Sequence, residues 1–199
     1  MKKMVWLLLV CLIIAGCVGF AGCAQAPDGN DTLPGEASVV QRGMVLSSDG
    51  IIDGVIADKY GMRGDQKEGQ TPTLSIPLSI ENAPTGTVCY AVSMMDPDSK
   101  PLCGYEWTHW LAVNIVTTDL PEDASICMKA EMTQCMNDFG SIGYGGPTPP
   151  DKPHTYVITV FALDCMIDLA DGFSKDEFGA ALSGHVLAEA QIKGSYANE

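Results

Sequence analysis

The chain has 199 residues, and its 25 acidic side chains against 11 basic ones give a formal net charge of −14. Proteins that bind nucleic acid meet the phosphate backbone with basic surfaces, so this balance argues against a nucleic-acid partner. The length suits one domain with a sizeable core better than two domains.

Residues 1–22 predict a lipoprotein signal peptide. Lys2 and Lys3 precede an almost unbroken apolar run, which is the order of a secretory leader. Two places where small residues precede a cysteine, at Cys17 and Cys23, are similar to the bacterial lipobox. We expect cleavage before Cys23, with Cys17 as the alternative, and acyl chains such as palmitate on that cysteine. A single uncleaved helix is the competing interpretation, since the run has about the length that crosses a bilayer.

Residues 23–37 predict a flexible tether that leads into a domain over residues 38–199. The tether is rich in proline, glycine and polar residues and offers few apolar side chains to bury. Beyond the leader, 9 basic side chains stand against 25 acidic ones, a net charge of −16. Any anion must therefore be held by local donors and not by the general field. We expect an exported protein, lipid-anchored at the outer face of a bacterial cell membrane.

Alternating side chains predict strands in the first half of the domain. From Leu74 to Ile80, apolar residues at every second position indicate a strand with one face toward a core, and Pro77 indicates an edge strand. The runs 88–95, 110–116 and 156–163 are rich in β-branched and aromatic residues and are bounded by turn residues. Short strands separated by such turns favour an antiparallel two-sheet sandwich.

The C-terminal part predicts a helix. Ser174 and Glu177 have the spacing of a capping box, in which the serine side chain accepts a hydrogen bond from the Glu177 amide. We expect a helix over residues 175–189, followed by a final strand over 192–196. The apolar stripe of this helix includes His185, so we expect the imidazole to face the body of the domain.

The domain contains an odd number of cysteines. Disulfides persist in exported proteins, so the alternatives are one or two bridges with a leftover thiol, or small buried thiols. No CxxC pair and no zinc-type spacing is present, so we expect neither a cysteine metal site nor a cofactor. These cysteines are Cys89, Cys103, Cys127, Cys135 and Cys165.

Two of the three histidines follow clusters of turn residues. Asp96-Pro97-Asp98 leads to His109, and the glycine and proline run 143–150 leads to His154. Each histidine lies at the start of a β run, so we expect both imidazoles at one rim of the sandwich. A carboxylate such as Asp96 would raise the pKa of a nearby imidazole and favour the doubly donating cation. Successive glycine amides would form a nest for an oxyanion, so the pattern predicts an anion pocket.

Four motifs in a fixed order carry a resemblance to a known family. They are Asp-Pro-Asp at 96–98, Trp-Thr-His-Trp at 107–110, Gly-Tyr-Gly-Gly-Pro-Thr-Pro-Pro with Pro-His-Thr-Tyr at 143–156, and Gly-His-Val-Leu at 184–187. This order resembles the phosphatidylethanolamine-binding protein family, in the bacterial and archaeal branch often labelled Raf kinase inhibitor-like. The resemblance covers roughly residues 44–196. It implies a mainly β, two-sheet antiparallel Greek-key sandwich with a C-terminal helix packed on it. It also implies a pocket for phosphate, phosphorylated head groups or carboxylates.

The resemblance also implies site residues by motif position. The ligand-binding positions it implies are Asp96, Asp98, His109, Gly146, Thr148, Pro150 and His154. Trp107 is expected to wall the pocket. Tyr105 lies near a pocket tyrosine of the eukaryotic members, although its offset from Trp107 differs. His185 matches the helix motif, where a structural role is implied.

The leading interpretation is a membrane-tethered binding protein for a small anion. One alternative is a hydrolase in which Asp96 and His109 form an acid–base pair and His154 stabilises an oxyanion. Others are a hydrolase inhibitor that presents the pocket loop, and a metal site made by two histidines and an aspartate. The sequence contains no Gly-x-Ser-x-Gly elbow and places no nucleophile against a histidine, so catalysis is left open.

Overall fold

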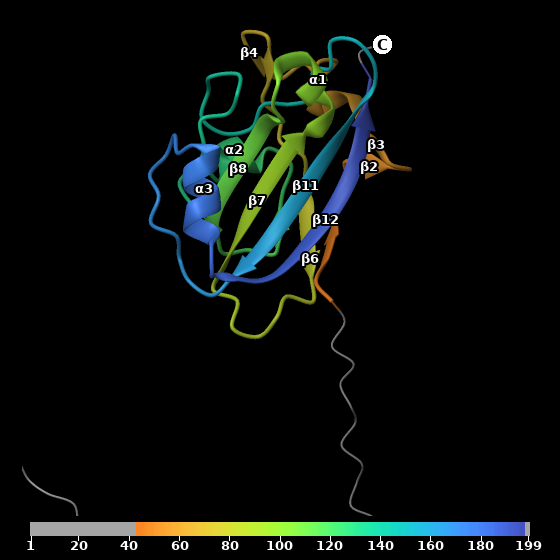
Figure 1. Cartoon of the computed structure of the whole chain (residues 1–199). Coiled ribbons are helices and arrows are strands. Elements are labelled where there is room, and N and C mark those ends of the chain that lie inside the picture. The colour runs from red at the N-terminus through yellow and green to blue at the C-terminus, as the bar shows by residue number, and fades with distance from the viewer. Residues whose placement is uncertain (1–42, 198–199) are drawn as a thin grey trace, which may run out of the picture. The chain divides into compact units, whose positions relative to one another are not determined.

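A computed structural model of the chain describes residues 43–197. The fold is mainly β, as expected, and most of its strands belong to one seven-stranded sheet in the order β10-β8-β7-β11-β12-β3-β2 (Figure 1). The elements in chain order are β1 (Val45–Ser47), β2 (Ile51–Ile52), β3 (Val55–Ile56), a 3-10 helix (Asp58–Tyr60), β4 (Lys67–Glu68), β5 (Thr71–Pro72), β6 (Leu78–Glu81), β7 (Cys89–Asp96), a second 3-10 helix (Pro97–Ser99), α1 (Lys100–Cys103), β8 (Trp107–Ile115), β9 (Asp119–Leu120), α2 (Ala124–Cys127), β10 (Thr133–Gln134), β11 (His154–Leu163), α3 (Lys175–Leu182) and β12 (Val186–Tyr196).

Strands β7 and β8 of the large sheet are buried on both faces. On β7, Val92 faces one core cluster together with Ile158, while Ala91 faces a second cluster together with Leu111. Because both faces of β7 are covered, its sequence is apolar at most positions and does not alternate between polar and apolar residues. The expected strands 88–95, 110–116 and 156–163 correspond to β7, β8 and β11 with shifts of no more than three residues at their ends.

The expected strand over 74–80 is only partly a strand. The regular strand β6 begins at Leu78 and pairs with β1 and β9 in a three-stranded sheet. Ile76 is nevertheless fully buried in the same core cluster as Leu78 and Ile80. The alternation therefore marked the buried face correctly from Ile76 to Ile80. The expectation of an edge strand is wrong, because β6 is the middle strand of its sheet. Pro77, which has no N–H to donate, precedes the ladder.

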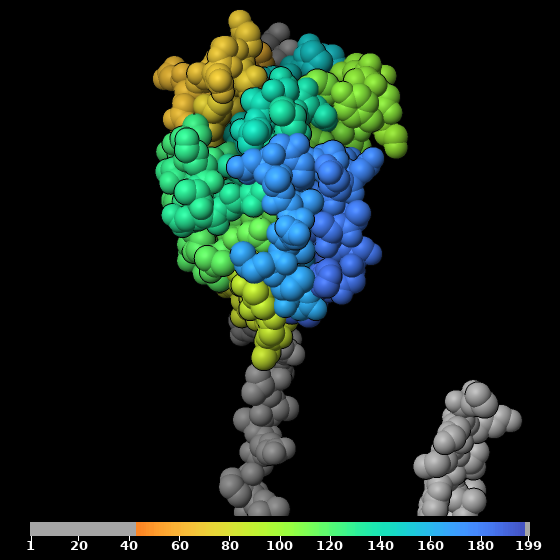
Figure 2. Space-filling view, turned by 90° about the vertical axis from the view of Figure 1, so that its left-hand side faces the viewer, coloured from red at the N-terminus to blue at the C-terminus, as the bar shows by residue number. Residues whose placement is uncertain are grey.

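Helix α3 begins as expected and ends earlier. Both hydrogen bonds of the Ser174–Glu177 capping box are formed. The helix ends at Leu182, not at residue 189, because Gly184 adopts a left-handed conformation at φ 84° and the chain continues as β12. Phe178 and Leu182 pack on the second face of the large sheet, which the segment containing α3 covers (Figure 2).

Antiparallel pairing brings four strand ends to one rim of the large sheet. The last residue of β7, Asp96, pairs with the first of β8, Trp107. At the same end, His154 opens β11 and pairs with Tyr196, the last residue of β12. This rim is the upper end in Figure 1, where α1 also lies. The fold therefore places both expected histidine segments at a common edge.

The remaining expectations concern the N-terminal leader, a membrane-spanning helix and the cysteines. The signal peptide, the lipidated cysteine and the tether lie outside the described residues. Within residues 43–197, no helix is both long and apolar enough to cross a membrane. All five cysteines of this region are free thiols, and Cys89 and Cys135 are buried. The alternative of buried thiols thus describes these two, and no disulfide joins any of the five.

Candidate functional site

A cavity of about 340 Å³ opens at the rim where β7, β8 and β11 meet. The structure brings six of the nine expected site residues to its wall. These are Asp96, Trp107, His109, Thr148, Pro150 and His154. Its other lining residues, which sequence reasoning did not select, are Ser99, Leu102, Cys103, Phe139 and Tyr156.

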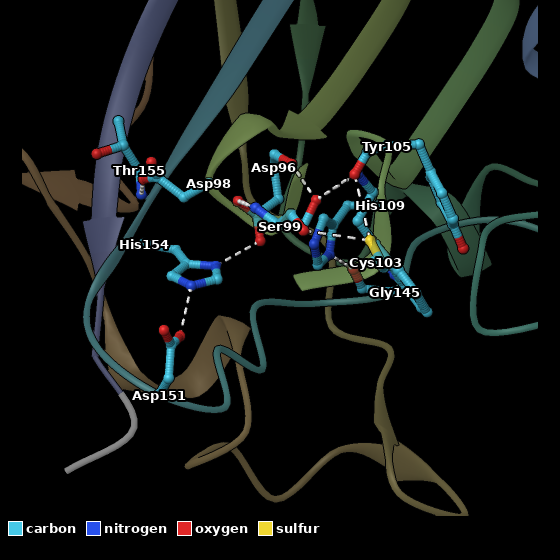
Figure 3. Close-up of polar contacts among 11 residues, drawn as sticks. Asp96, Asp98, Ser99, Cys103, Tyr105, His109, Gly145, Asp151, His154 and Thr155 are labelled. Atoms are coloured by element: carbon cyan, nitrogen blue, oxygen red, sulfur yellow. Dashed lines mark hydrogen bonds and ion pairs between the residues drawn. The ribbon is translucent and has the colours of Figure 1, made fainter. Parts of the chain in front are cut away.

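Asp96, His154 and Asp151 form a hydrogen-bonded chain at one side of the cavity (Figure 3). The Asp96 carboxylate is 4% exposed and accepts from His154 Nδ1 at 2.7 Å and from the Ser99 amide at 3.2 Å. His154 Nε2 reaches Asp151 Oδ1 at 2.9 Å. Burial opposes the charged imidazolium, but the hydrogen bonds to Asp96 and Asp151 raise the pKa of His154 above its ordinary value.

This arrangement uses both ring nitrogens of His154. A doubly donating imidazolium between two carboxylates has no N–H left for a ligand. His154 therefore positions and neutralises Asp96, and it is not itself a donor to the cavity. The expected role of His154 as a direct anion contact is not what this geometry provides.

His109 differs from the expectation in its charge. Its Nδ1 lies 2.6 Å from the Gly145 carbonyl oxygen, which can only accept, so Nδ1 carries the proton. Burial lowers the pKa of His109 to about 4, and the nearby Asp96 charge only partly offsets this effect. The imidazole is neutral at pH 7. Its Nε2 is then an acceptor and not a second donor.

The pKa values of the two imidazoles are shifted in opposite directions from the ordinary value. We expect NMR of the ring nitrogens to show His109 neutral down to about pH 4 and His154 still protonated above pH 6.5. Between pH 6.5 and about 4, the unfolded chain binds a proton at residue 109 that the folded protein does not. His109 thus lowers the free energy of unfolding as the pH falls through this window, by up to about 3 kcal/mol. A His109 resonance that titrates near pH 6.5 would contradict this.

Two buried polar atoms at the cavity have no partner. The Tyr156 hydroxyl and Trp107 Nε1 are buried, and neither donates a hydrogen bond to a described residue. Tyr156 is fully buried, and burial, followed by the charge of Asp96, raises its pKa, so the phenol keeps its proton. Buried donors without partners are rare because each costs about 1–3 kcal/mol. Both atoms belong to residues that line the cavity.

The glycine-rich loop does not form the expected amide nest. The Gly143 amide donates to Cys135 O, the Gly145 amide to His109 O, and the Gly146 amide to Pro72 O. These amides therefore fasten the loop to the body of the domain. A Cβ at Gly146 would lie 2.2 Å from Tyr60 O, so the glycine is required for close approach of two backbones.

Asp98 and Tyr105 lie outside the wall of the cavity. Asp98 Oδ2 accepts from the Thr155 amide at 2.8 Å and so fixes the start of β11. Tyr105 is 48% exposed, and its ring stacks on that of Trp107 at a centroid distance of 6.0 Å. Asp98 and Tyr105 support cavity residues but do not face the cavity.

The residues that sequence reasoning missed come from two segments without a periodic signal. Leu102 and Cys103 lie on α1, a single turn whose position depends on the cap between Asp96 and the Ser99 amide. Phe139 lies in the loop after β10 and packs edge-on against His109 at 5.5 Å. Tyr156 was visible in the sequence, as the second residue after His154, where period-two alternation returns a side chain to the same face.

Comparison with known proteins identifies the family of the chain. The family model described as phosphatidylethanolamine-binding protein matches residues 46–197. The chain belongs to the phosphatidylethanolamine-binding protein family. The residues that match the family model include every residue of the cavity wall.

Proteins of similar sequence include bacterial and archaeal ones. The uncharacterized protein YxkA of Bacillus subtilis is 38% identical over 152 residues, which are 68% of this chain and 90% of YxkA. A UPF0098 protein of Methanothermobacter thermautotrophicus is 37% identical over 127 residues, which are 62% of this chain and 82% of the relative.

Solved structures of the family share the fold. The putative phosphatidylethanolamine-binding protein homolog CT736 of Chlamydia trachomatis aligns with a TM-score of 0.68 and 31% identity, covering 77% of this chain and 97% of CT736. YbcL of Escherichia coli, described as a new member of the mammalian family, aligns with a TM-score of 0.67 and 31% identity, covering 78% of this chain and 98% of YbcL.

Proposed function

We propose that this chain is a membrane-tethered, extracytoplasmic binding protein that holds a small anionic group in the rim cavity. The group is a phosphate, a phosphorylated head group or a carboxylate. The observation that carries the proposal is the pair of unpartnered buried donors, Trp107 Nε1 and the Tyr156 hydroxyl. Oxyanion oxygens are acceptors that satisfy both, which removes the cost of leaving them buried and unpaired.

The charges around the cavity define the kind of anion. Asp96 is neutralised by the His154 imidazolium, and His109 is neutral, so the anion is held by neutral donors. Such a site favours a group of low charge over a dianion, because no unpaired cation compensates its desolvation. His109 Nε2 accepts the O–H of a protonated phosphate or carboxylic acid. Leu102 and Phe139 line the cavity as apolar walls for a carbon substituent.

Export, lipid anchoring and the two-sheet Greek-key arrangement are part of the same proposal. The charged and then apolar leader, followed by Cys23 or Cys17 and a polar stretch, supports export and lipid anchoring. The expected two-sheet Greek-key arrangement is supported by the shared core. Leu46 and Ile80 of the three-stranded sheet belong to the same cluster as Val92 of the large sheet.

The hydrolase alternative requires Asp96 and His109 to act as an acid–base pair. The Asp96 oxygens instead accept from His154 and from the Ser99 amide, while His109 Nδ1 is bound to a carbonyl. Cys103, the thiol at the cavity wall, has hydrogen bonds to two carbonyl oxygens and none to a histidine. The geometry therefore favours binding over acid–base catalysis, and no feature of it favours the inhibitor.

Replacing Tyr156 with phenylalanine tests the proposal. We expect affinity for phosphate, phosphoethanolamine or acetate, measured by titration calorimetry, to fall roughly 10-fold, the effect of about one lost hydrogen bond. The free energy of unfolding without ligand should not fall, because the hydroxyl has no partner to lose. Comparing the three ligands distinguishes a phosphoryl site from a general carboxylate site.

Tyr144 provides the matched control. Its hydroxyl is also buried but donates to Tyr60 O at 3.0 Å, and it does not line the rim cavity. Tyr144→Phe should therefore cost about 1 kcal/mol of stability and leave affinity unchanged. Equal affinities in the parent and Tyr156→Phe, or no binding of any of the three ligands by the parent, would overturn the proposed function.

A further inference from the structure

Three side chains of the metal-ligating types gather at the end of the large sheet opposite the rim cavity. Asp164 and Cys165 directly follow β11, and His185 directly precedes β12. In the β11–β12 ladder, His154 pairs at the cavity end and Leu163 at the other, roughly 30 Å away at the usual rise per residue. One potential ligand atom from each of the three residues lies within 4.8 Å of the other two. This cluster has no part in the proposed anion site.

The distances within the cluster suit a tetrahedral ion. His185 Nδ1 lies 2.9 Å from Asp164 Oδ1 and 3.3 Å from Cys165 Sγ. Zinc bonds of about 2.0–2.3 Å at tetrahedral angles place neighbouring ligand atoms roughly 3.3–3.6 Å apart. These two distances need to change by only a few tenths of an ångström to admit the ion, which side-chain rotation can supply, and the Asp164 and Cys165 ligand atoms lie within 4.8 Å of each other.

The backbone around the cluster is already fixed. The Asp164 amide donates to His185 O at 3.1 Å, which ties the two ligand segments together. Cys165 O accepts from the buried Cys89 thiol at 3.1 Å, and the His185 amide donates to Leu182 O at 3.1 Å. Such support keeps the ligands in place without the ion, so binding does not have to order a loop.

The cluster is open to solvent on its outer side. The side chains of His185 and Asp164 are 46% and 45% exposed, so an ion can reach them. A thiol and an imidazole select a borderline-soft cation such as Zn²⁺ over Mg²⁺ or Ca²⁺, which prefer oxygen ligands alone. The net charge of −14 also attracts cations to the protein.

We propose that Asp164, Cys165 and His185 form a three-ligand site for Zn²⁺ or a similar transition-metal cation, with the fourth position taken by water. Cys165 binds as the thiolate and releases its proton to solvent. The ion joins the end of β11 to the start of β12, next to the irregularity in their pairing at Ala162 and Leu163.

Cobalt titration of the full chain tests the site, because Co²⁺ replaces Zn²⁺ and reports a bound thiolate by a sulfur-to-cobalt absorption band. We expect Cys165→Ser to bind one equivalent less cobalt than the parent and to lose the corresponding band. His185→Gln and Asp164→Asn should lower the affinity for that equivalent of cobalt. The loss should exceed the roughly 10–100-fold that is typical when a residue next to a metal ligand is changed. Zn²⁺ should displace the cobalt and raise the melting temperature of the parent but not of Cys165→Ser.

Cys127→Ser is the matched control, because Cys127 is an exposed thiol outside the cluster. It should keep the stoichiometry, the band and the affinity of the parent. The proposal is overturned if the parent and Cys165→Ser bind the same amount of cobalt, or if Cys127→Ser shows the same loss. It is equally overturned if His185→Gln and Asp164→Asn, verified as folded by circular dichroism, bind as tightly as the parent.

Discussion

Replacing Asp96 with asparagine should lower the free energy of unfolding by about 3 kcal/mol, because the change removes one partner of a buried ion pair. The asparagine has nearly the same shape, but it leaves the His154 imidazolium without its buried counter-charge. We expect the pKa of His154 to fall, since the hydrogen bond to Asp96 is the largest of the effects that raise it. Denaturant unfolding at pH 7 measures the loss of stability, and NMR of His154 measures the change in pKa.

Asp151→Asn is the control for this prediction. Its carboxylate contacts the other nitrogen of the same imidazole at 2.9 Å, but its side chain is 43% exposed. Solvent screens such a contact, so its removal should change stability far less than Asp96→Asn. Equal effects of the two substitutions would contradict the assignment of Asp96 as the buried counter-ion.

Gly146→Ala should destabilise the protein by about 3 kcal/mol, at the upper end of the range for overpacking. The added methyl group would lie 2.2 Å from Tyr60 O and 2.9 Å from Pro72 Cβ. The nearest of these atoms belongs to the backbone, so the clash is relieved only by moving the loop away from the body of the domain. Thermal and denaturant unfolding check the loss.

Gly179→Ala supplies the opposite control. Gly179 lies inside α3, and a Cβ there would meet no atom within 4 Å. Alanine favours the helix over glycine by roughly 0.5–1 kcal/mol, so this variant should be slightly more stable than the parent. A Gly146→Ala protein as stable as the parent would show that the loop does not need this close approach.

The sequence was sufficient to locate the main strands and the rim that they share. β-branched and aromatic composition between turn residues located β7, β8 and β11, and the capping-box spacing located the first residue of α3. Antiparallel pairing then requires the end of β7 and the start of β8 to meet, which brings Asp96 to the same edge as His109. The motif order at 96–98 and 143–156 agreed with this placement.

The protonation of the site could not be predicted from residue types. Asp96 was expected to raise the pKa of a nearby imidazole, and its carboxylate does so for His154. His109 is buried deeply enough that desolvation outweighs the same charge, and depth of burial is a property of the packed structure. The amide directions of the 143–146 loop likewise depend on distant acceptors such as Pro72 O.

The end of α3 was missed for a related reason. The apolar stripe continued through His185, but the residues from Val186 onward pair with β11 across the whole length of β12. Ladder hydrogen bonds with an existing strand outweighed helical propensity there. His185 consequently lies 46% exposed beside Asp164 instead of facing the core.

NMR of the indole N–H groups shows whether the unpartnered donors in the rim cavity bind an oxyanion. Trp110 Nε1 already donates to Gln134 Oε1 at 2.8 Å and serves as an internal reference, whereas Trp107 Nε1 has no partner. Phosphate titration should move the Trp107 indole resonance downfield to saturation and leave that of Trp110 in place. A Trp107 resonance that stays fixed while phosphate or acetate binds elsewhere on the protein would contradict the account.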